Sequence, residues 1–265
     1  MNINSENYYG DNRISTALLL AAGTGSRLFP LTKSSPKCLT LVNEKSILER
    51  LVNNLKKQGF KRLVIVTGYK NECIIDFLGS NSGDLSIEYI HSPLYRTTNN
   101  IYSLWIARNI INEPFVLLES DLVLNTSLLD EMVYPDKIAV AKMEPWLEGT
   151  TVSINKQNHV TKFHKGTKDT YTDIRYKTVN IYSFSLISWH AIIKKLNQSI
   201  SEGNVNSYYE TVFAGMVDDK SLSLESVSFD YKPWYEIDNV HDLAEAEKLF
   251  PVEMKTRATQ EKIYV

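Results

Sequence analysis

A glycine-containing loop directly behind an apolar run is the most informative part of the sequence: Leu20-Ala21-Ala22-Gly23-Thr24-Gly25-Ser26-Arg27-Leu28-Phe29-Pro30-Leu31-Thr32. Residues 17–22 are all apolar, without polar alternation, which is typical of a buried central strand. The two glycines let main-chain N–H groups approach an anion without a Cβ in the way. This stretch predicts a strand that ends in an anion-binding loop.

Strand and helix patterns alternate outward from this loop as far as about residue 140. Ser46 and Glu49 have capping-box spacing and start an amphipathic helix that ends before Gly59, and residues 63–68 form a second apolar strand. Further patterns predict strands at 87–90 and 115–118, with a helix at about 101–111 between them. Two apolar strands joined by a helix indicate a parallel βαβ unit, so we expect a doubly wound, mainly parallel, Rossmann-like α/β sheet.

The pattern of apolar and polar residues changes after about residue 140. Short strand patterns at 151–154, 159–163 and 178–182 are separated by polar turns and predict antiparallel additions to the sheet. Helices near 189–200 and 207–217, a strand over 222–229 and a final helix over 240–250 follow. We expect a single domain over 1–265, with one half at about 15–140, a second half at about 141–250 and a charged tail at 251–265.

Composition excludes several classes of partner. The net charge is −2, so we expect neither nucleic acid nor a membrane surface to be bound, and an anion must meet a local group of cations. The first fourteen residues are polar, and no apolar run reaches the length of a membrane span. Cys38 and Cys73 match no zinc or disulfide spacing. We expect a reducing, cytoplasmic setting.

Two cations near the loop complete a pattern that suits a triphosphate. Arg27 lies within the loop and Lys37 follows in Ser35-Pro36-Lys37. Backbone donors match the shape of a phosphate chain, and the cations offset the charge that develops during transfer. A Rossmann fingerprint would place a third glycine at Leu28, and a Walker A motif is absent.

Two acidic segments with the same spacing predict a metal site. Glu119-Ser120-Asp121 ends an apolar strand, where alternation would point both acids to one side, and Glu236-Ile237-Asp238 precedes a helix that starts near Asn239. Mg²⁺ binds carboxylate oxygens together with phosphate oxygens. We expect Asp121 and Asp238 to serve as ligands and Glu119 to be a solvated strand end, with Glu236 open between these roles. Asp238 as a helix N-cap is the alternative.

The string from Leu20 to Thr32, with Ser35-Pro36-Lys37, resembles the signature of the nucleotidyltransferases that activate sugar phosphates, phosphocholine and phosphonates. The resemblance runs from Ala17 to Phe250. It implies that Arg27 and Lys37 contact the NTP phosphates, and that Asp121 and Asp238, with Glu236 as third ligand, hold Mg²⁺. The first half then binds the nucleotide and the second half the acceptor. The implied nucleotide-binding residues are Leu20, Ala21, Ala22, Gly23, Thr24, Gly25, Ser26, Gly68, Asn99 and Ser120.

Later blocks resemble one branch of this family. Residues 95–104 resemble the phosphocholine and phosphonate cytidylyltransferases, and residues 177–182 and 234–238 look most like the phosphonate branch. Asn99 and Asn100 either cap a helix or contact a base or the acceptor, since an amide both donates and accepts. Of the cations Lys162, Lys165 and Lys177, at least one should meet the acceptor's oxyanions, with Lys177 first.

The acceptor end of the expected site favours a hydrogen-bonding head group. Glu148 is followed by hydroxyls at Thr150 and Thr151, and Trp146 is an isolated aromatic. A primary ammonium prefers a carboxylate, whereas a quaternary ammonium prefers a cage of aromatic faces. This balance and the resemblance both favour 2-aminoethylphosphonate.

The sequence therefore predicts a Mg²⁺-dependent transfer of CMP from CTP to a small phosphonate or phosphomonoester, with release of pyrophosphate. Alternative enzymes are a phosphocholine cytidylyltransferase and a sugar-1-phosphate nucleotidyltransferase. A non-catalytic regulatory or subunit-interaction module on the same fold is a further alternative, against which the joint presence of Lys37, Asp121 and Asp238 argues. Whether the chain forms a homodimer is left open by the sequence.

Overall fold

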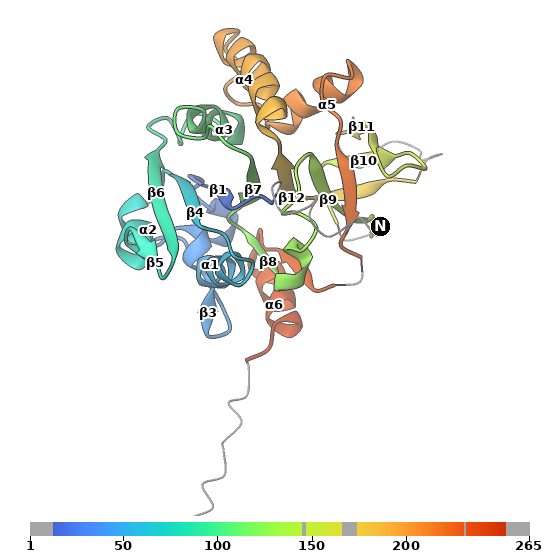
Figure 1. The fold of residues 1–265 in the computed structure, drawn as a ribbon. Coiled ribbons are helices and arrows are strands. Elements are labelled where there is room, and N and C mark those ends of the chain that lie inside the picture. Colours follow the sequence, from blue (N-terminus) through green and yellow to red (C-terminus); the bar gives the residue numbers. More distant parts are fainter. Residues whose placement is uncertain (1–12, 145–146, 166–173, 231, 253–265) are drawn as a thin grey trace, which may run out of the picture.

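One large mixed sheet dominates the computed structural model, which describes residues 13–144, 147–165, 174–230 and 232–252 (Figure 1). Its strand order is β11-β10-β12-β7-β1-β4-β6-β5, with β9 beside β12 and β13 beside β9. The strands are β1 (Thr16–Ala21), β4 (Arg62–Thr67), β5 (Asn81–Ser82), β6 (Leu85–His91), β7 (Phe115–Glu119), β9 (Lys137–Lys142), β10 (Thr151–Ile154), β11 (Val160–His164), β12 (Tyr176–Phe184) and β13 (Glu225–Ser228).

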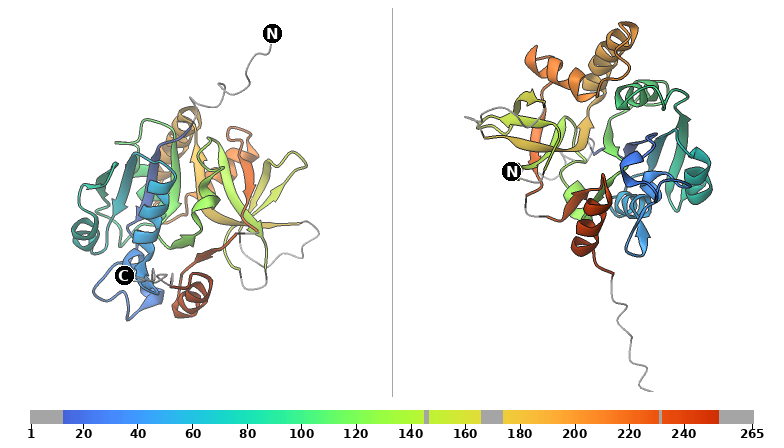
Figure 2. Two further views of the ribbon diagram at one scale, coloured as in Figure 1. Left: turned by 60° about the horizontal axis from the view of Figure 1, so that its bottom comes forward. Right: turned by 180° about the vertical axis from the view of Figure 1, so that it is seen from behind.

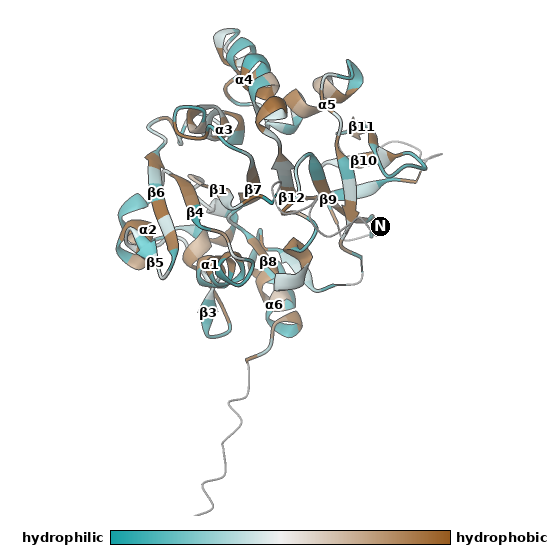
Figure 3. Cartoon of the chain, viewed as in Figure 1, coloured by the Kyte–Doolittle hydropathy of each residue, from teal (hydrophilic) through white to brown (hydrophobic). Residues whose placement is uncertain are grey.

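The first half of the sheet is parallel. β1 pairs in parallel with β4 and β7, and β4 pairs in parallel with β6. Every residue of β1 is buried because its apolar side chains face helices on both sides. Apolar residues dominate the neighbouring strands β4 and β7 as well (Figure 3).

Helices cover both faces of this parallel half. Ala17 and Leu19 pack in one core with α1 (Ile47–Lys57), whereas Leu18 and Leu20 pack in another with α3 (Asn100–Ala107), α4 (Leu186–Ser201) and α5 (Glu210–Asp218). α1 begins as predicted, since the Ser46 side chain accepts a hydrogen bond from the Glu49 N–H at 3.1 Å. The doubly wound α/β fold is confirmed.

The second half adds antiparallel strands, as predicted. β12 runs antiparallel to β7, with Ile181 opposite Leu118, and also pairs with β9 and β10. The helix expected at 101–111 ends at Ala107, and the strand expected over 222–229 is confined to 225–228. The tail from residue 253 lies outside the described residues.

Two small sheets, the strands β5 and β9 of the large sheet, and one helix had no counterpart in the sequence prediction. β8 (Leu122–Leu124) pairs antiparallel with β14 (Trp234–Glu236), β2 (Leu41–Val42) pairs with β3 (Lys45–Ser46), and α2 is Asn71–Leu78. The predicted last helix is α6 (Val240–Leu249), which lies beside the N-terminal segments in both views of Figure 2. It shares a third apolar core with β8, β14 and the glycine loop: Leu28, Val42, Ile47, Val123, Ile237 and Ala246.

Within the described part of the chain, no helix combines the length and the apolar character that crossing a membrane requires.

Candidate active site

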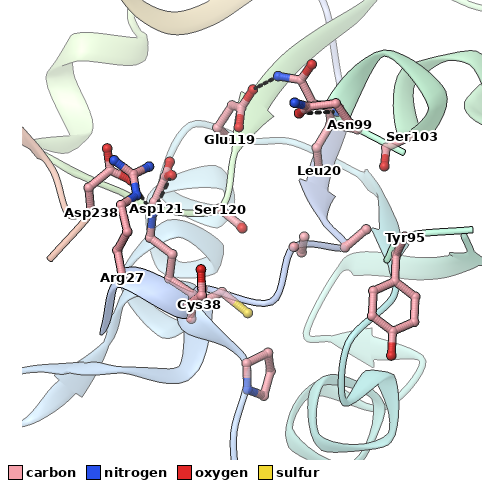
Figure 4. Close-up of a pocket in the computed structure, with 18 of the residues that line it drawn as sticks. Leu20, Arg27, Cys38, Tyr95, Asn99, Ser103, Glu119, Ser120, Asp121 and Asp238 are labelled. Atoms are coloured by element: carbon pink, nitrogen blue, oxygen red, sulfur yellow. Dashed lines mark hydrogen bonds and ion pairs between the residues drawn. The ribbon is translucent and has the colours of Figure 1, made fainter. Parts of the chain in front are cut away.

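A cavity of about 280 Å³ opens where β1 and β7 end (Figure 4). Its floor is the loop behind β1, because β1 stops at Ala21 and the chain turns over the sheet edge. Arg27, Lys37, Asp121 and Asp238 line it, and Arg27, Asp121 and Asp238 lie together on one side in Figure 4. The predicted nucleotide-binding residues among its walls are Leu20, Ala21, Ala22, Gly23, Gly25, Ser26, Asn99 and Ser120.

Two glycines shape this loop in different ways. Gly25 has φ +61°, and a Cβ there would lie 2.9 Å from the Lys37 Cβ, so the turn requires glycine. A Cβ at Gly68 would lie 2.5 Å from the Ala22 carbonyl oxygen, so this glycine allows the end of β4 to approach the loop. Gly68 and Thr24 do not line the cavity.

Lys37 lies at the centre of a network of charges. Its Nζ donates to Asp121 Oδ2 and Asp238 Oδ1, both at 2.8 Å, and Arg27 Nη2 donates to Asp238 Oδ1 at 2.7 Å. Burial alone would lower the pKa of Lys37, but the two carboxylates outweigh it and raise the pKa above its ordinary value. Burial would likewise raise the pKa of Asp238, which Lys37 and Arg27 instead hold below its usual value. The Lys37 ammonium and the Asp238 carboxylate are therefore charged at neutral pH.

Three carboxylates from two segments converge beside Lys37. Asp121, Glu236 and Asp238 each offer one oxygen, and these atoms lie within 4.8 Å of one another. Asp121 Oδ1 is buried without a hydrogen-bond partner, which suits an oxygen that serves as a ligand to a cation. The two segments are neighbours because β14 pairs with β8 and the Ile237 N–H donates to the Asp121 carbonyl at 3.0 Å. The N-cap of α6 is Asn239, which leaves the Asp238 carboxylate to the site.

Comparison with known proteins identifies the family. The family model described as nucleotidyl transferase matches residues 16–164, more than half of the chain. The chain belongs to the nucleotidyl transferase family. The family is one of enzymes, and the glycine loop that carries its sequence motif lines the first cavity.

Several relatives of this nucleotidyl transferase have curated names. It is 25% identical over 250 residues to the CTP:phosphoglutamine cytidylyltransferase of Campylobacter jejuni, covering 86% of this chain and 97% of the relative. It is 25% identical to the 2-aminoethylphosphonate cytidylyltransferase of Lancefieldella rimae, covering 86% and 90%. A CMP-5'-(3-aminopropyl)phosphonate synthase of Streptomyces rubellomurinus is 33% identical over 150 residues, which are 56% of this chain and 24% of that relative's length.

The fold agrees with these relatives. The solved CTP:phosphocholine cytidylyltransferase of Streptococcus pneumoniae superposes with a TM-score of 0.77 at 21% identity, covering 90% of this chain and all of that chain.

A second cavity of about 620 Å³ adjoins the first on the side of the antiparallel strands. The residues that line both cavities are Arg27, Asn100, Glu119, Asp121, Tyr208 and Asp238. The residues predicted to bind the acceptor, Lys165, Lys177, Glu148 and Asn100, all line this second cavity. Trp146 lies outside the described residues.

The predicted acceptor residues differ in their surroundings. Lys177 is only 2% exposed, and its ammonium donates to the Thr178 carbonyl at 2.7 Å and pairs with Glu236 Oε2 at 3.1 Å. Asn180 donates to the other oxygen of Glu236 at 3.1 Å. Two side chains of β12 therefore hold Glu236 in place. Lys165 and Glu148, in contrast to Lys177, are exposed.

The prediction of a solvated strand end at Glu119 is wrong. β7 ends against α3, so Glu119 is half-buried and accepts a hydrogen bond from Asn100 Nδ2 at 3.0 Å. Burial, followed by the charges of Asp121 and Glu210, raises its pKa to about 8. Asp121 lines the same two cavities, so the expectation that both acids face one space is confirmed.

The two asparagines divide the roles that the sequence left open. Asn99 caps α3, accepting from the Asn100 N–H at 2.8 Å, and it also lines the first cavity. Asn100 donates to Glu119 and accepts from the Tyr209 N–H at 3.0 Å. It therefore joins the end of β7 to the start of α5.

Glu210 is a cavity residue that sequence reasoning missed. It is the first residue of α5 and lines the second cavity, although it is only 7% exposed. An acid in the first turn of a helix is common for reasons of the helix dipole alone. The sequence therefore carried no signal that set Glu210 apart.

Proposed function

We propose that this nucleotidyl transferase is a Mg²⁺-dependent cytidylyltransferase that moves CMP from CTP to a small phosphonate or phosphate ester and releases pyrophosphate, with 2-aminoethylphosphonate as the favoured acceptor. One observation carries the proposal: the Lys37 ammonium contacts both Asp121 and Asp238, and these two carboxylates line both the first and the second cavity. The names of relatives that span most of the chain support cytidylyl transfer to phosphorus acceptors.

The charges of the site suit the attack of one anion on another. A phosphonate or phosphate oxyanion is already a nucleophile at neutral pH, so the transfer needs no general base. The obstacle is the Coulomb repulsion between acceptor and triphosphate, which cations close to the reacting phosphorus reduce. Arg27 and Lys37, which contact the carboxylates of Asp121 and Asp238, would contact the phosphates of a bound nucleotide.

The carboxylates fit the proposed metal ion. Asp121 and Asp238, with Glu236 beside them, would hold Mg²⁺, which when bound neutralises phosphate charge and orients phosphate oxygens. Lys177 and Lys165 lie in the second cavity, where the acceptor's oxyanions would need positive charge.

Pyrophosphate release tests the proposal directly. Each of the four NTPs is combined with 2-aminoethylphosphonate, phosphocholine or glucose 1-phosphate, with Mg²⁺ or with EDTA. We expect the highest rate with CTP and 2-aminoethylphosphonate and none with EDTA. A preference for a sugar phosphate or for another NTP would contradict the assignment. No release from any pair, despite saturable nucleotide binding, would favour the non-catalytic alternative.

A further inference from the structure

One carboxylate oxygen of Glu210, a residue that lines the second cavity, has no hydrogen-bond partner. Glu210 is only 7% exposed, and the atom without a partner is its Oε2. A buried carboxylate oxygen that lacks a donor is costly, because no water compensates its lost hydration. Because Glu210 lines the second cavity, a ligand bound there can supply the donor.

The second cavity is lined by charged residues of both signs. The cations are Arg27, Lys165 and Lys177, and the acids are Glu119, Asp121, Glu148, Glu210, Glu236 and Asp238. The Lys177 ammonium is already engaged by Glu236 and by the Thr178 carbonyl. The Asn100 side chain donates to Glu119 at 3.0 Å and accepts a hydrogen bond from the N–H of Tyr209, the residue before Glu210. Asn100 therefore links Glu119 to the segment that carries Glu210. A ligand that carries both an anionic and a cationic group would find side chains of opposite charge for each in this cavity.

The missing partner is a hydrogen-bond donor. A quaternary ammonium cannot donate and is usually held by several aromatic faces, whereas a primary ammonium donates up to three hydrogen bonds. Among the described residues that line this cavity, only Phe163 and Tyr208 are aromatic. The chemistry of the wall therefore favours a primary amine.

We propose that Glu210 binds the primary ammonium group of the acceptor, with Glu119 beside it, and so selects aminated over non-aminated acceptors. This inference rests on the proposed function and names the group that the site recognises. Glu148, which the sequence favoured for this contact, is exposed in the same cavity wall and provides a rival position. Burial raises the pKa of Glu210 to about 7, so an incoming ammonium would favour its charged form.

The test compares two acceptors that differ only in the amine. CTP-dependent pyrophosphate release is measured with 2-aminoethylphosphonate and with ethylphosphonate, and each kcat/KM is determined. We expect the parent protein to prefer the aminated acceptor by at least about tenfold, as suits a charge-assisted hydrogen bond. Glu210→Gln should reduce the preference to below about threefold by slowing only the aminated acceptor, and Glu210→Asp should keep part of it.

A matched control separates this effect from general damage. Glu72 is an exposed acid in the first turn of α2, outside both cavities, so Glu72→Gln makes the same change at an equivalent helix position. It should leave the preference unchanged. Gln is close in shape to a protonated Glu, so Glu210→Gln should fold, which thermal melting verifies.

The outcomes are distinguishable. An unchanged preference in folded Glu210→Gln overturns the inference, as does a loss of preference in Glu148→Gln alone. An equal fall with both acceptors gives Glu210 a structural role and also overturns it. If the parent protein transfers no nucleotide at all, the proposed function fails. Calorimetric binding of 2-aminoethylphosphonate to the parent and to Glu210→Gln then decides the inference, which tighter binding to the parent supports and equal binding overturns.

Discussion

Lys37 contacts two carboxylates from distant segments and is only 14% exposed along its side chain. If its ammonium stabilises charge on the transferred phosphate, Lys37→Met should lower kcat roughly 10²–10³-fold, which corresponds to about 3–4 kcal/mol of barrier. Methionine keeps the apolar stem, so the variant should fold. Turnover at saturating substrates checks the prediction, and near-normal turnover would remove Lys37 from the reaction.

Asp121 and Asp238 can be tested through the metal dependence of the reaction. Asp121→Asn and Asp238→Asn preserve shape but remove a charged oxygen ligand, so activity should fall and the Mg²⁺ concentration for half-maximal rate should rise. Titration of each variant with Mg²⁺ measures this shift. A variant that titrates like the parent protein would show that its residue is not a ligand.

The sequence identified these charged residues because they lie in or near a recognisable string or beside an apolar strand. Arg27 and Lys37 follow the glycine loop, and Asp121 follows a buried strand. Glu119 was misjudged because the packing of α3 against the end of β7 is a tertiary contact. Gly68 stays a predicted nucleotide-binding residue, and the structure adds that a Cβ at this position would collide with the Ala22 carbonyl oxygen.

At the scale of the element, the start of α6 holds the segment that carries Asp238. The Asn239 side chain accepts from the N–H groups of His241 and Asp242, and Asp242 Oδ2 accepts from the Asp238 N–H at 2.8 Å. Asn239→Ala should cost about 1 kcal/mol of unfolding free energy, as is usual for an N-cap. It should also lower kcat by at least about tenfold, because Asp238 would shift.

Ser46→Ala is the matched control for the cap. Ser46 caps α1 away from both cavities, so its loss should destabilise by a similar amount without changing kcat. Urea unfolding and turnover are measured on both variants. Equal kcat values in the two would show that the α6 cap has no part in placing Asp238.

Several elements that the sequence predicted have a clear local signal. α1 has a cap and an apolar stripe, and β1, β4 and β7 are apolar runs bounded by turns. β8 and β14 have three residues each, too few for a period, and they pair across more than a hundred residues of chain. Their pairing depends on the finished sheet and on the core around Ile237, so local pattern could not reveal it.

At the scale of the whole molecule, the buried acid of the second cavity makes stability depend on pH. Burial raises the pKa of Glu210 from 4.5 to about 7, with Glu236 adding to the rise and Lys177 and Lys165 opposing it. The folded protein then keeps a proton that the unfolded chain has lost, so this residue's contribution to stability falls as pH rises from about 4.5 to about 7.

Glu210→Gln should remove that dependence. Relative to the parent protein, the variant should gain little unfolding free energy near pH 4.5 and on the order of 3 kcal/mol near pH 8. Urea unfolding of both proteins without substrate at several pH values measures the difference. A difference that does not change with pH would show that Glu210 does not titrate in this range.

The pairing of β14 with β8 also bears on how such a chain can change in length. The two strands and the Ile237–Asp121 hydrogen bond join residues 121–124 to residues 234–238 in one unit, here called the clip. The clip carries the three carboxylates of Asp121, Glu236 and Asp238. The chain between Leu124 and Trp234 leaves this clip and returns to it, and it includes β12, whose Lys177 and Asn180 hold Glu236. Insertions and deletions in the turns of that segment therefore leave the carboxylates in register as long as β12 and the two ends keep their places. A single residue gained or lost between Asp121 and Leu124, or between Trp234 and Asp238, would shift one carboxylate out of the cluster.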